Sequence, residues 1–133
     1  MKRTFFSLAL LLAVATLTAQ TKMTAREAAV KIADRILAST TYEFKNTKTG
    51  EIYKSVKKLP LDMDVKVACK YNNWHYTNGV TNMALMELGD KLGDKKYEKY
   101  VLKNMNFVFN EGNLDFFRKQ YDEAFKRDGW NAV

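Results

Sequence analysis

The chain has very little of three residue types that carry much of protein chemistry. Its 133 residues include one cysteine, one histidine and one proline. A disulfide needs two thiols, so Cys69 has no partner within the chain, and we expect a buried free thiol unless it pairs between chains. With His75 as the only histidine, a four-ligand zinc site is not expected. The sequence therefore predicts no metal site.

Long apolar runs are also scarce, and the run Phe5 to Val14 is too short to span a membrane comfortably. Lys2 and Arg3 precede it, and Ala19 follows it as a small residue at a cleavage point. This order is typical of a secretory signal peptide, with an ordinary N-terminal helix as the alternative. We predict a signal peptide over residues 1–19, a mature domain over residues 20–133, a periplasmic or extracellular location, and no membrane span after cleavage.

The charge is positive but dispersed. The net charge is +7, and removal of Lys2 and Arg3 with the signal peptide leaves +5. Scattered lysines usually form a solvated surface, and they also attract acidic polymers such as nucleic acid or uronic-acid polysaccharide. The secretory signal disfavours nucleic acid, and the basic residues do not alternate with aromatics along one stripe. We therefore expect no nucleic-acid partner.

The first half of the mature chain predicts one helix and one small hairpin. Thr24-Ala-Arg-Glu27 has the form of a capping box, and apolar residues at helical spacing follow it. This predicts a helix from about Ala25 to Ala38. The short alternating runs 42–44 and 52–56 flank a turn that contains Gly50, which indicates a hairpin or an extended arm. The segment 61–71 has no clear periodicity, and we expect an irregular connection there.

The second half predicts three helices. They cover about 78–92, 95–110 and 114–126, with Gly93 and Asp94 as a helix stop and a new N-cap between the first two. So short a link makes these two helices antiparallel neighbours. The expected core-facing residues are Val80, Met83, Ala84, Leu88 and Leu92 on the first helix, and Tyr97, Tyr100, Val101, Met105 and Val108 on the second.

The last predicted helix carries more aromatic surface than the rest of the chain is expected to cover. Its residues Phe116, Phe117, Tyr121 and Phe125 lie on several sides, and Trp130 follows. A complete domain would need partners for these rings. We therefore expect the sequence to be the front part of a longer protein.

One motif carries a family resemblance. Asn73-Trp-His-Tyr-Thr-Asn-Gly-Val80, an apolar helix and then Leu92-Gly-Asp-Lys-Lys-Tyr97 resemble the first helical repeat of glycoside hydrolase families 88 and 105. These are the unsaturated glucuronyl and unsaturated rhamnogalacturonyl hydrolases. The similarity extends over roughly residues 25–133. It implies an all-α fold of antiparallel helical hairpins, of which this chain would be the first part of an incomplete (α/α)6 barrel, or toroid.

The resemblance also implies a reaction. The substrates would be oligosaccharides from pectin or glycosaminoglycan that end in a 4,5-unsaturated uronic acid. An aspartic acid protonates the double bond, water adds, and the resulting hemiketal opens so that the glycosidic bond breaks. That acid must change its protonation state near the working pH. Neither a metal nor another cofactor takes part.

The resemblance places Trp74, His75 and Tyr76 at the substrate, since aromatic faces suit the apolar faces of a sugar ring. The structural alternative is that Trp74 anchors the core and His75 caps the following helix. The catalytic aspartate is expected beyond Val133. Asp122 is the candidate within the chain, but its setting, Lys119-Gln-Tyr-Asp122, is that of a solvated helix residue paired with a lysine.

Two functions from different classes remain open. Twelve helices need on the order of 200 residues or more, so the first hypothesis is an inactive N-terminal fragment of the hydrolase. The second is a small secreted helical module that binds an acidic glycan or a protein without catalysis.

Overall fold

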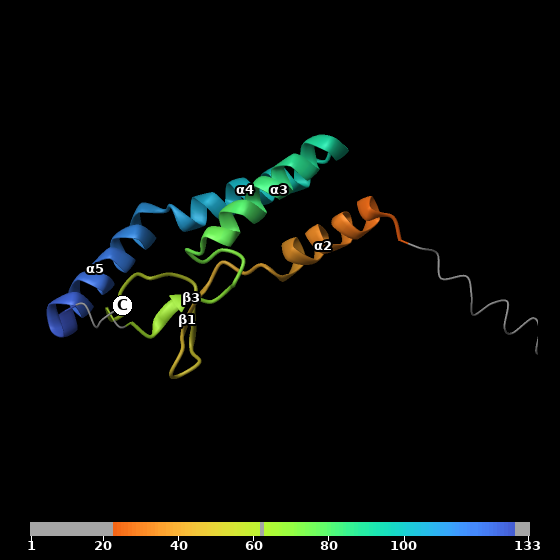
Figure 1. Cartoon of the computed structure of the whole chain (residues 1–133). Helices are drawn as coiled ribbons and strands as arrows, with labels where there is room; N and C mark the ends of the chain where they lie inside the picture. The colour runs from red at the N-terminus through yellow and green to blue at the C-terminus, as the bar shows by residue number, and fades with distance from the viewer. Residues whose placement is uncertain (1–22, 62, 130–133) are drawn as a thin grey trace, which may run out of the picture. The chain divides into compact units, whose positions relative to one another are not determined.

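The computed structural model describes residues 23–61 and 63–129 (Figure 1). The predicted signal peptide, its cleavage point and Trp130 lie outside the described residues. The chain divides into two units, Met1–Lys31 and Ile32–Val133, and each is considered by itself.

The described part of the first unit is the start of helix α2, Ala25–Ser39. The Glu27 amide donates to Thr24 Oγ1 at 3.2 Å, and the Thr24 amide donates to Glu27 Oε2 at 2.8 Å. The bond from the Thr24 amide also lowers the pKa of the Glu27 carboxyl, because it favours the ionised form. The predicted capping box and the predicted helix are both confirmed.

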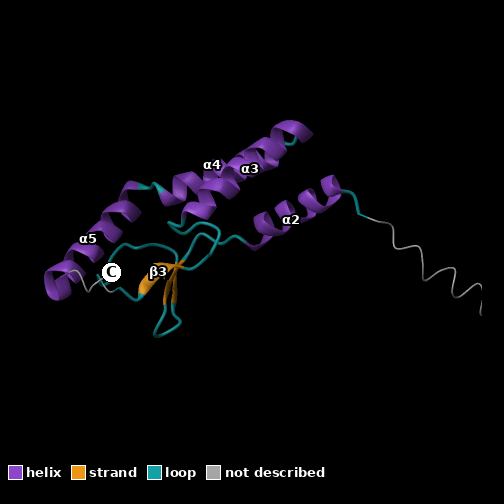
Figure 2. Cartoon of the chain, viewed as in Figure 1, coloured by secondary structure: helices purple, strands orange, loops and turns teal. Residues whose placement is uncertain are grey.

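A small antiparallel sheet follows α2 (Figure 2). Its strands β1 (Phe44–Asn46), β2 (Ile52–Tyr53) and β3 (Val65–Val67) lie in the order β2-β1-β3. The β1–β2 turn is held by Asn46 Oδ1, which accepts from two turn amides, and Gly50 takes the left-handed φ of 78°. The predicted hairpin is confirmed. The third strand lies in the segment expected to be irregular, because three residues are too few to show a period.

Helices α3 (Tyr76–Leu92) and α4 (Lys95–Val108) form the predicted antiparallel hairpin. Gly93 ends α3 with a left-handed φ of 66°, and Asp94 Oδ1 accepts from the Lys96 amide at 3.0 Å. Gly89 lets the two helices approach closely. A Cβ atom there would lie 3.2 Å from the Asp94 carbonyl oxygen and 3.3 Å from Tyr97 Cβ.

The predicted inner face of α3 is wrong in part. Val80 is 61% exposed and Met83 is 74% exposed, whereas Leu88 and Leu92 pack against the core. The fully buried positions of the helix are Asn78, Asn82, Leu85 and Gly89. Three of these four residues do not count as hydrophobic, so hydropathy points to the wrong side of the helix. On α4, Tyr97, Tyr100 and Val101 are buried as predicted, but Met105 is exposed and Asn104 is buried in its place.

Two separate apolar clusters form the core of the second unit. The hairpin cluster consists of Ala33, Leu85, Tyr97, Tyr100 and Val101. The sheet cluster consists of Phe44, Val56, Val65 and Phe116. The last helix, α5 (Glu111–Asp128), contributes Phe116 and begins at Asn110, whose side chain accepts from the amides of Gly112 and Asn113.

The fold is thus mostly helical in the described ranges, as predicted, with a small three-stranded sheet of which the sequence predicted only the β1–β2 hairpin. None of the helices in these ranges is long and apolar enough to cross a lipid bilayer.

Candidate functional site

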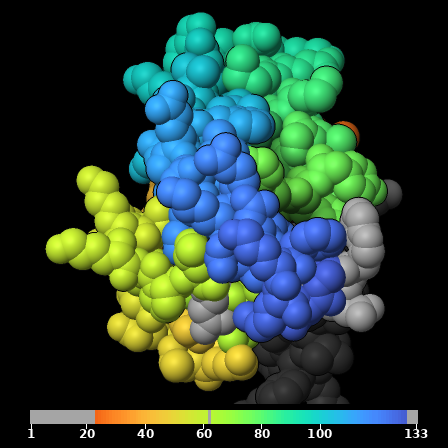
Figure 3. Space-filling view, turned by 90° about the vertical axis from the view of Figure 1, so that its left-hand side faces the viewer, coloured from red at the N-terminus to blue at the C-terminus, as the bar shows by residue number. Residues whose placement is uncertain are grey.

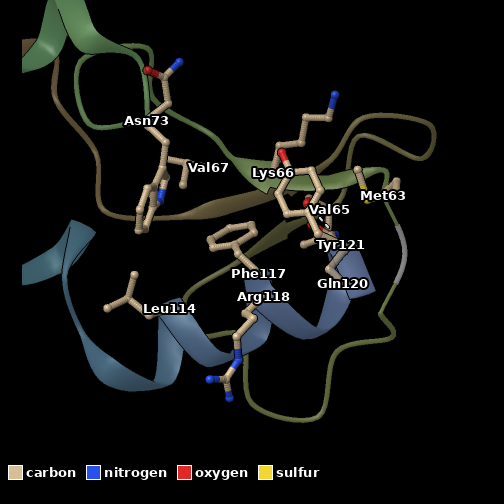
Figure 4. A pocket seen from close by; sticks show the side chains of 11 residues that line it. Met63, Val65, Lys66, Val67, Asn73, Leu114, Phe117, Arg118, Gln120 and Tyr121 are labelled. Carbon is tan, nitrogen blue, oxygen red and sulfur yellow. Dashed lines mark hydrogen bonds between the residues drawn. The ribbon is translucent and has the colours of Figure 1, made fainter. Parts of the chain in front are cut away.

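A cleft of about 620 Å³ lies between strand β3 and helix α5 (Figure 4). Its size is within the usual range of small-molecule sites. It is lined by Met63, Val65, Lys66, Val67, Asn73, Trp74, Leu114, Phe117, Arg118, Gln120 and Tyr121. Figure 3 shows α5, in blue, lying against the yellow-green segment that contains β3.

Helix α5 is held on the sheet by one face. Phe116, Gln120 and Ala124 are buried at intervals of four residues, and Gln120 Nε2 donates to the Val65 carbonyl oxygen at 3.0 Å. Each residue that follows one of these lies about 100° further around the helix. Phe117 and Tyr121 are therefore placed at the margin of the buried face, where they line the cleft.

The loop before α3 places Trp74 in the wall of the cleft. Asn73 Oδ1 accepts from the buried Asn78 Nδ2 at 2.6 Å and from the His75 amide at 3.3 Å. Asn104 Nδ2 donates to the Tyr71 carbonyl at 3.1 Å, so α4 also holds this loop. The loop backbone is therefore fixed on both sides of Trp74 before any ligand binds.

The Trp74 side chain is 54% exposed, and its ring lies 5.8 Å from that of Phe109 in an edge-on arrangement. A residue with more than half of its surface exposed does not anchor a core. The alternative interpretation of Trp74 as a core residue is therefore wrong.

His75 and Tyr76 lie outside the lining of the cleft. Tyr76 is 77% exposed, and its ring lies 5.1 Å from the His75 ring. His75 occupies the N-cap position of α3, but its side chain makes no capping bond; its Nδ1 lies 2.8 Å from Thr77 Oγ1 instead. Of the three residues predicted to contact substrate, Trp74 therefore lines the cleft, whereas His75 and Tyr76 lie outside its lining.

Among the described residues that line the cleft, Lys66 and Arg118 are cationic and none carries a carboxyl group. The Lys66 side chain extends from β3 away from α5, on the face of the sheet opposite to Val65 and Val67 (Figure 4), and no ion pair joins it to another described residue. Arg118 extends from α5 and pairs with Asp115 at 2.7 Å, a carboxylate that Lys119 also contacts at 2.6 Å. These two partners, with Lys119 the stronger, lower the pKa of Asp115. The charges around the cleft therefore favour an anionic ligand.

Asp122 does not lie in the cleft. It is exposed on α5, and Lys126, one turn further along, pairs with Glu123 at 2.8 Å. The described residues also contain no group of three or more histidine, cysteine or acidic side chains that would hold a metal. The residues of the cleft are suited to binding a ligand, and none of them is placed as a general acid.

The sequence pointed to Trp74 but not to most of its neighbours. Lys66, Val67, Leu114, Phe117 and Arg118 come from two segments about fifty residues apart. The unusual aromatic content of α5 was the available signal, and Phe117 and Tyr121 are part of it. A comparison with models of known families, with curated proteins and with solved structures finds no match.

Proposed function

We propose that this chain is the N-terminal, sugar-contacting part of a secreted glycoside hydrolase that acts on oligosaccharides ending in a 4,5-unsaturated uronic acid. The observation that carries the proposal is the position of Trp74. This residue of the Trp-Xaa-Tyr motif presents an exposed ring to a cleft that is lined by aromatic and cationic side chains. Such a lining suits an acidic sugar, whose ring has apolar faces and whose carboxylate carries negative charge.

The helices give a second line of support. An (α/α)6 barrel is built from antiparallel hairpins, and α3 and α4 form such a hairpin around a Gly-Asp link. Each of the three last helices also has exposed apolar residues outside the hairpin and sheet clusters, namely Val80, Met83, Leu102 and Phe125. In the proposed enzyme, neighbouring hairpins cover these residues.

The acid that protonates the double bond is then expected elsewhere in the proposed enzyme. The described residues of the cleft lining include no carboxyl group, and Asp122 is exposed on α5. We therefore expect this chain to bind the unsaturated sugar without turning it over.

A second candidate is a secreted non-catalytic module that binds an acidic glycan. It is favoured by the same observation, a cleft whose described lining includes aromatic and cationic residues and no carboxyl group. A partner protein in place of the glycan is the other form of this hypothesis.

The test is a calorimetric titration of the chain with an unsaturated uronyl disaccharide, paired with an assay that follows the ultraviolet absorbance of its double bond. We expect binding without loss of absorbance. Trp74→Ala should abolish binding, and the matched control Phe125→Ala, which removes an exposed ring of α5 outside the cleft lining, should leave it unchanged.

Three outcomes decide between the hypotheses. No binding by the unaltered chain, or equal binding by the Trp74→Ala variant, overturns the proposed site. Loss of absorbance overturns the expectation that the chain lacks the acid. Equal binding of the saturated disaccharide favours the non-catalytic module over the hydrolase.

A further inference from the structure

Strand β3 is an edge of the sheet, and its hydrogen bonds show which of its backbone groups face outward. Two bonds to β1 flank the strand, and these run from the Ala68 amide to the Glu43 carbonyl oxygen at 2.9 Å and from the Thr47 amide to the Asp64 carbonyl oxygen at 2.8 Å. In an antiparallel ladder, residues whose backbone groups face the neighbouring strand alternate with residues whose groups face away from it. The backbone groups of Val65 and Val67 therefore point away from β1, toward the open edge.

One of these outward groups already has a partner. Gln120 Nε2 donates to the Val65 carbonyl oxygen at 3.0 Å from outside the sheet, as the outward direction requires. The amide and the carbonyl of Val67 form no hydrogen bond with another residue in the described part of the chain, and Val67 is only partly buried. Val67 thus presents one donor and one acceptor side by side, which is the pair that a further antiparallel strand uses.

The open edge borders the cleft. Val65, Lys66 and Val67 all line it, although the Lys66 side chain extends away from α5 (Figure 4). The main chain of Lys66 is therefore the part that reaches the cleft. Across from this edge, Phe117 and Leu114 of α5 offer apolar surface. Because side chains alternate between the two faces of a sheet, a strand added to β3 would direct every second side chain into the cleft.

The outer face of the sheet carries positive charge at the same edge. Lys66 lies directly opposite Lys45 of β1, and both are exposed. Like charges in this arrangement are unfavourable. Glu43 is two positions before Lys45, and no ion pair among the described residues joins it to either lysine. A residue added opposite Lys66 on the outer side would have its Cβ about 4.5–5.5 Å from that of Lys66, so a carboxylate there would form a favourable pair.

We infer that β3 binds an extended peptide as a fourth strand of the sheet, and that this peptide carries an acidic residue between two apolar ones. The acidic residue lies opposite Lys66 on the outer face, and the apolar residues lie opposite Val65 and Val67 and enter the cleft. Main-chain hydrogen bonds at Val67 supply affinity, and the alternating side chains supply specificity. The inference goes beyond the proposed function. Since both ligands use the cleft, the peptide and a sugar would exclude each other.

The test is a nuclear magnetic resonance titration of the isotope-labelled chain with the capped peptide Thr-Val-Glu-Val-Thr. We expect the Val67 amide to shift and to exchange more slowly with solvent, because it gains a hydrogen bond. The Lys66 amide faces β1 and should change little. The same peptide with both valine nitrogens methylated should not bind, because it lacks the donors that pair with the edge.

The charge preference is tested by exchange on both sides. The peptide with lysine in place of glutamate should bind about two- to tenfold more weakly, since a like charge then faces Lys66. Lys66→Glu should reverse this order, and its fold should be retained because the new carboxylate lies opposite Lys45. Lys99→Glu, which changes an exposed lysine of α4 outside the cleft lining, is the matched control and should keep the original order.

The inference is overturned if the glutamate peptide does not bind, if the methylated peptide binds equally well, or if Lys66→Glu keeps the order of the unaltered chain. Its failure can be told apart from failure of the proposed function. Binding of the unsaturated disaccharide without binding of the peptide leaves the proposed function and removes the edge site. Binding of the peptide without binding of the disaccharide does the opposite.

Discussion

The two apolar clusters of this chain differ in how they are covered. The hairpin cluster is closed, whereas the sheet cluster is open to the cleft on one side. In the hairpin cluster Tyr97 is fully buried, and its hydroxyl donates to Asp34 Oδ1 at 2.9 Å. The Tyr100 hydroxyl lies 2.9 Å from Thr40 Oγ1. In the sheet cluster, by contrast, Phe117 and Val67 pack on the buried residues and also line the cleft.

The difference has a geometric cause. Two helices of similar length can bring their whole facing sides together, and Gly89 lets α3 and α4 do so at short distance. A sheet with strands of two and three residues is much smaller than the helix that lies on it. Part of the apolar side of α5 therefore extends beyond the sheet and forms a wall of the cleft. A partly covered core is where we expect a ligand, because its apolar surface is already in place.

The largest effect is expected at the deep side of the sheet cluster. Phe44 is 1% exposed, and its ring lies 5.3 Å from that of Phe107 and 6.0 Å from that of Phe117. Phe44→Ala should lower the free energy of unfolding by about 3–5 kcal/mol, because it removes a buried ring and leaves a cavity in the cluster. Phe117→Ala should cost less, because the cleft already exposes that ring. Urea unfolding followed by circular dichroism measures both, and equal losses would contradict an open cluster.

The two sides of α3 give the next comparison. Leu85 is 4% exposed within the hairpin cluster, and Leu85→Ala should cost about 2–5 kcal/mol. Met83 lies on the opposite side, and Met83→Ala should change stability by no more than about 0.5 kcal/mol. Urea titrations of the two variants, analysed with a common slope, provide the measurement. A larger loss for Met83→Ala would restore the inner face that hydropathy predicts.

The close approach of α3 and α4 is tested at Gly89. Gly89→Val should destabilise by about 1–3 kcal/mol, because its side chain would overlap the Asp94 carbonyl and Tyr97. Gly79 in the same helix faces open space. Gly79→Ala should raise stability by about 0.5–1 kcal/mol, because alanine restricts the unfolded chain and favours the helix. Thermal unfolding of the two variants gives both signs, and a neutral Gly89→Val would show that the helices can separate without loss.

The smallest effect concerns the polar contacts of the hairpin cluster and depends on pH. Lys96, at 2.8 Å, and the Tyr97 hydroxyl hold the pKa of Asp34 below the usual value of an aspartic acid. A lowered folded-state pKa contributes stability above the unfolded-state value and loses it as the pH falls through the folded-state value. Asp34→Asn should therefore be less stable than the unaltered chain at neutral pH, and the difference should shrink as the pH falls below about 4 and disappear once the pH is below the lowered pKa of Asp34.

Urea unfolding of both proteins between neutral and acidic pH measures this difference. Tyr97→Phe keeps the carboxylate and Lys96 but removes one donor, so its pH-dependent loss should be smaller than that of Asp34→Asn. A difference between Asp34→Asn and the unaltered chain that stays constant with pH would mean that ionisation of Asp34 contributes nothing to the fold.

Local signals in the sequence determined where most helices begin and end. The Thr24-Glu27 capping box, the Gly93 stop and the Asp94 cap act through hydrogen bonds within a few residues, so they can be read without the rest of the chain. Trp74 could also be chosen from its motif, although its role as a sugar contact stays a prediction.

Tertiary structure alone decided the orientation of α3, the existence of β3 and the composition of the cleft. Asn82 is buried because Asn104 Nδ2 donates to its side-chain oxygen at 3.1 Å, a bond between residues 22 positions apart. Gln120 donates to the Val65 carbonyl, 55 positions away, and this contact places Phe117 and Tyr121 beside β3 in the lining of the cleft. Hydropathy and residue spacing cannot predict these long-range hydrogen bonds, because the partners meet only after the helices and the sheet have packed.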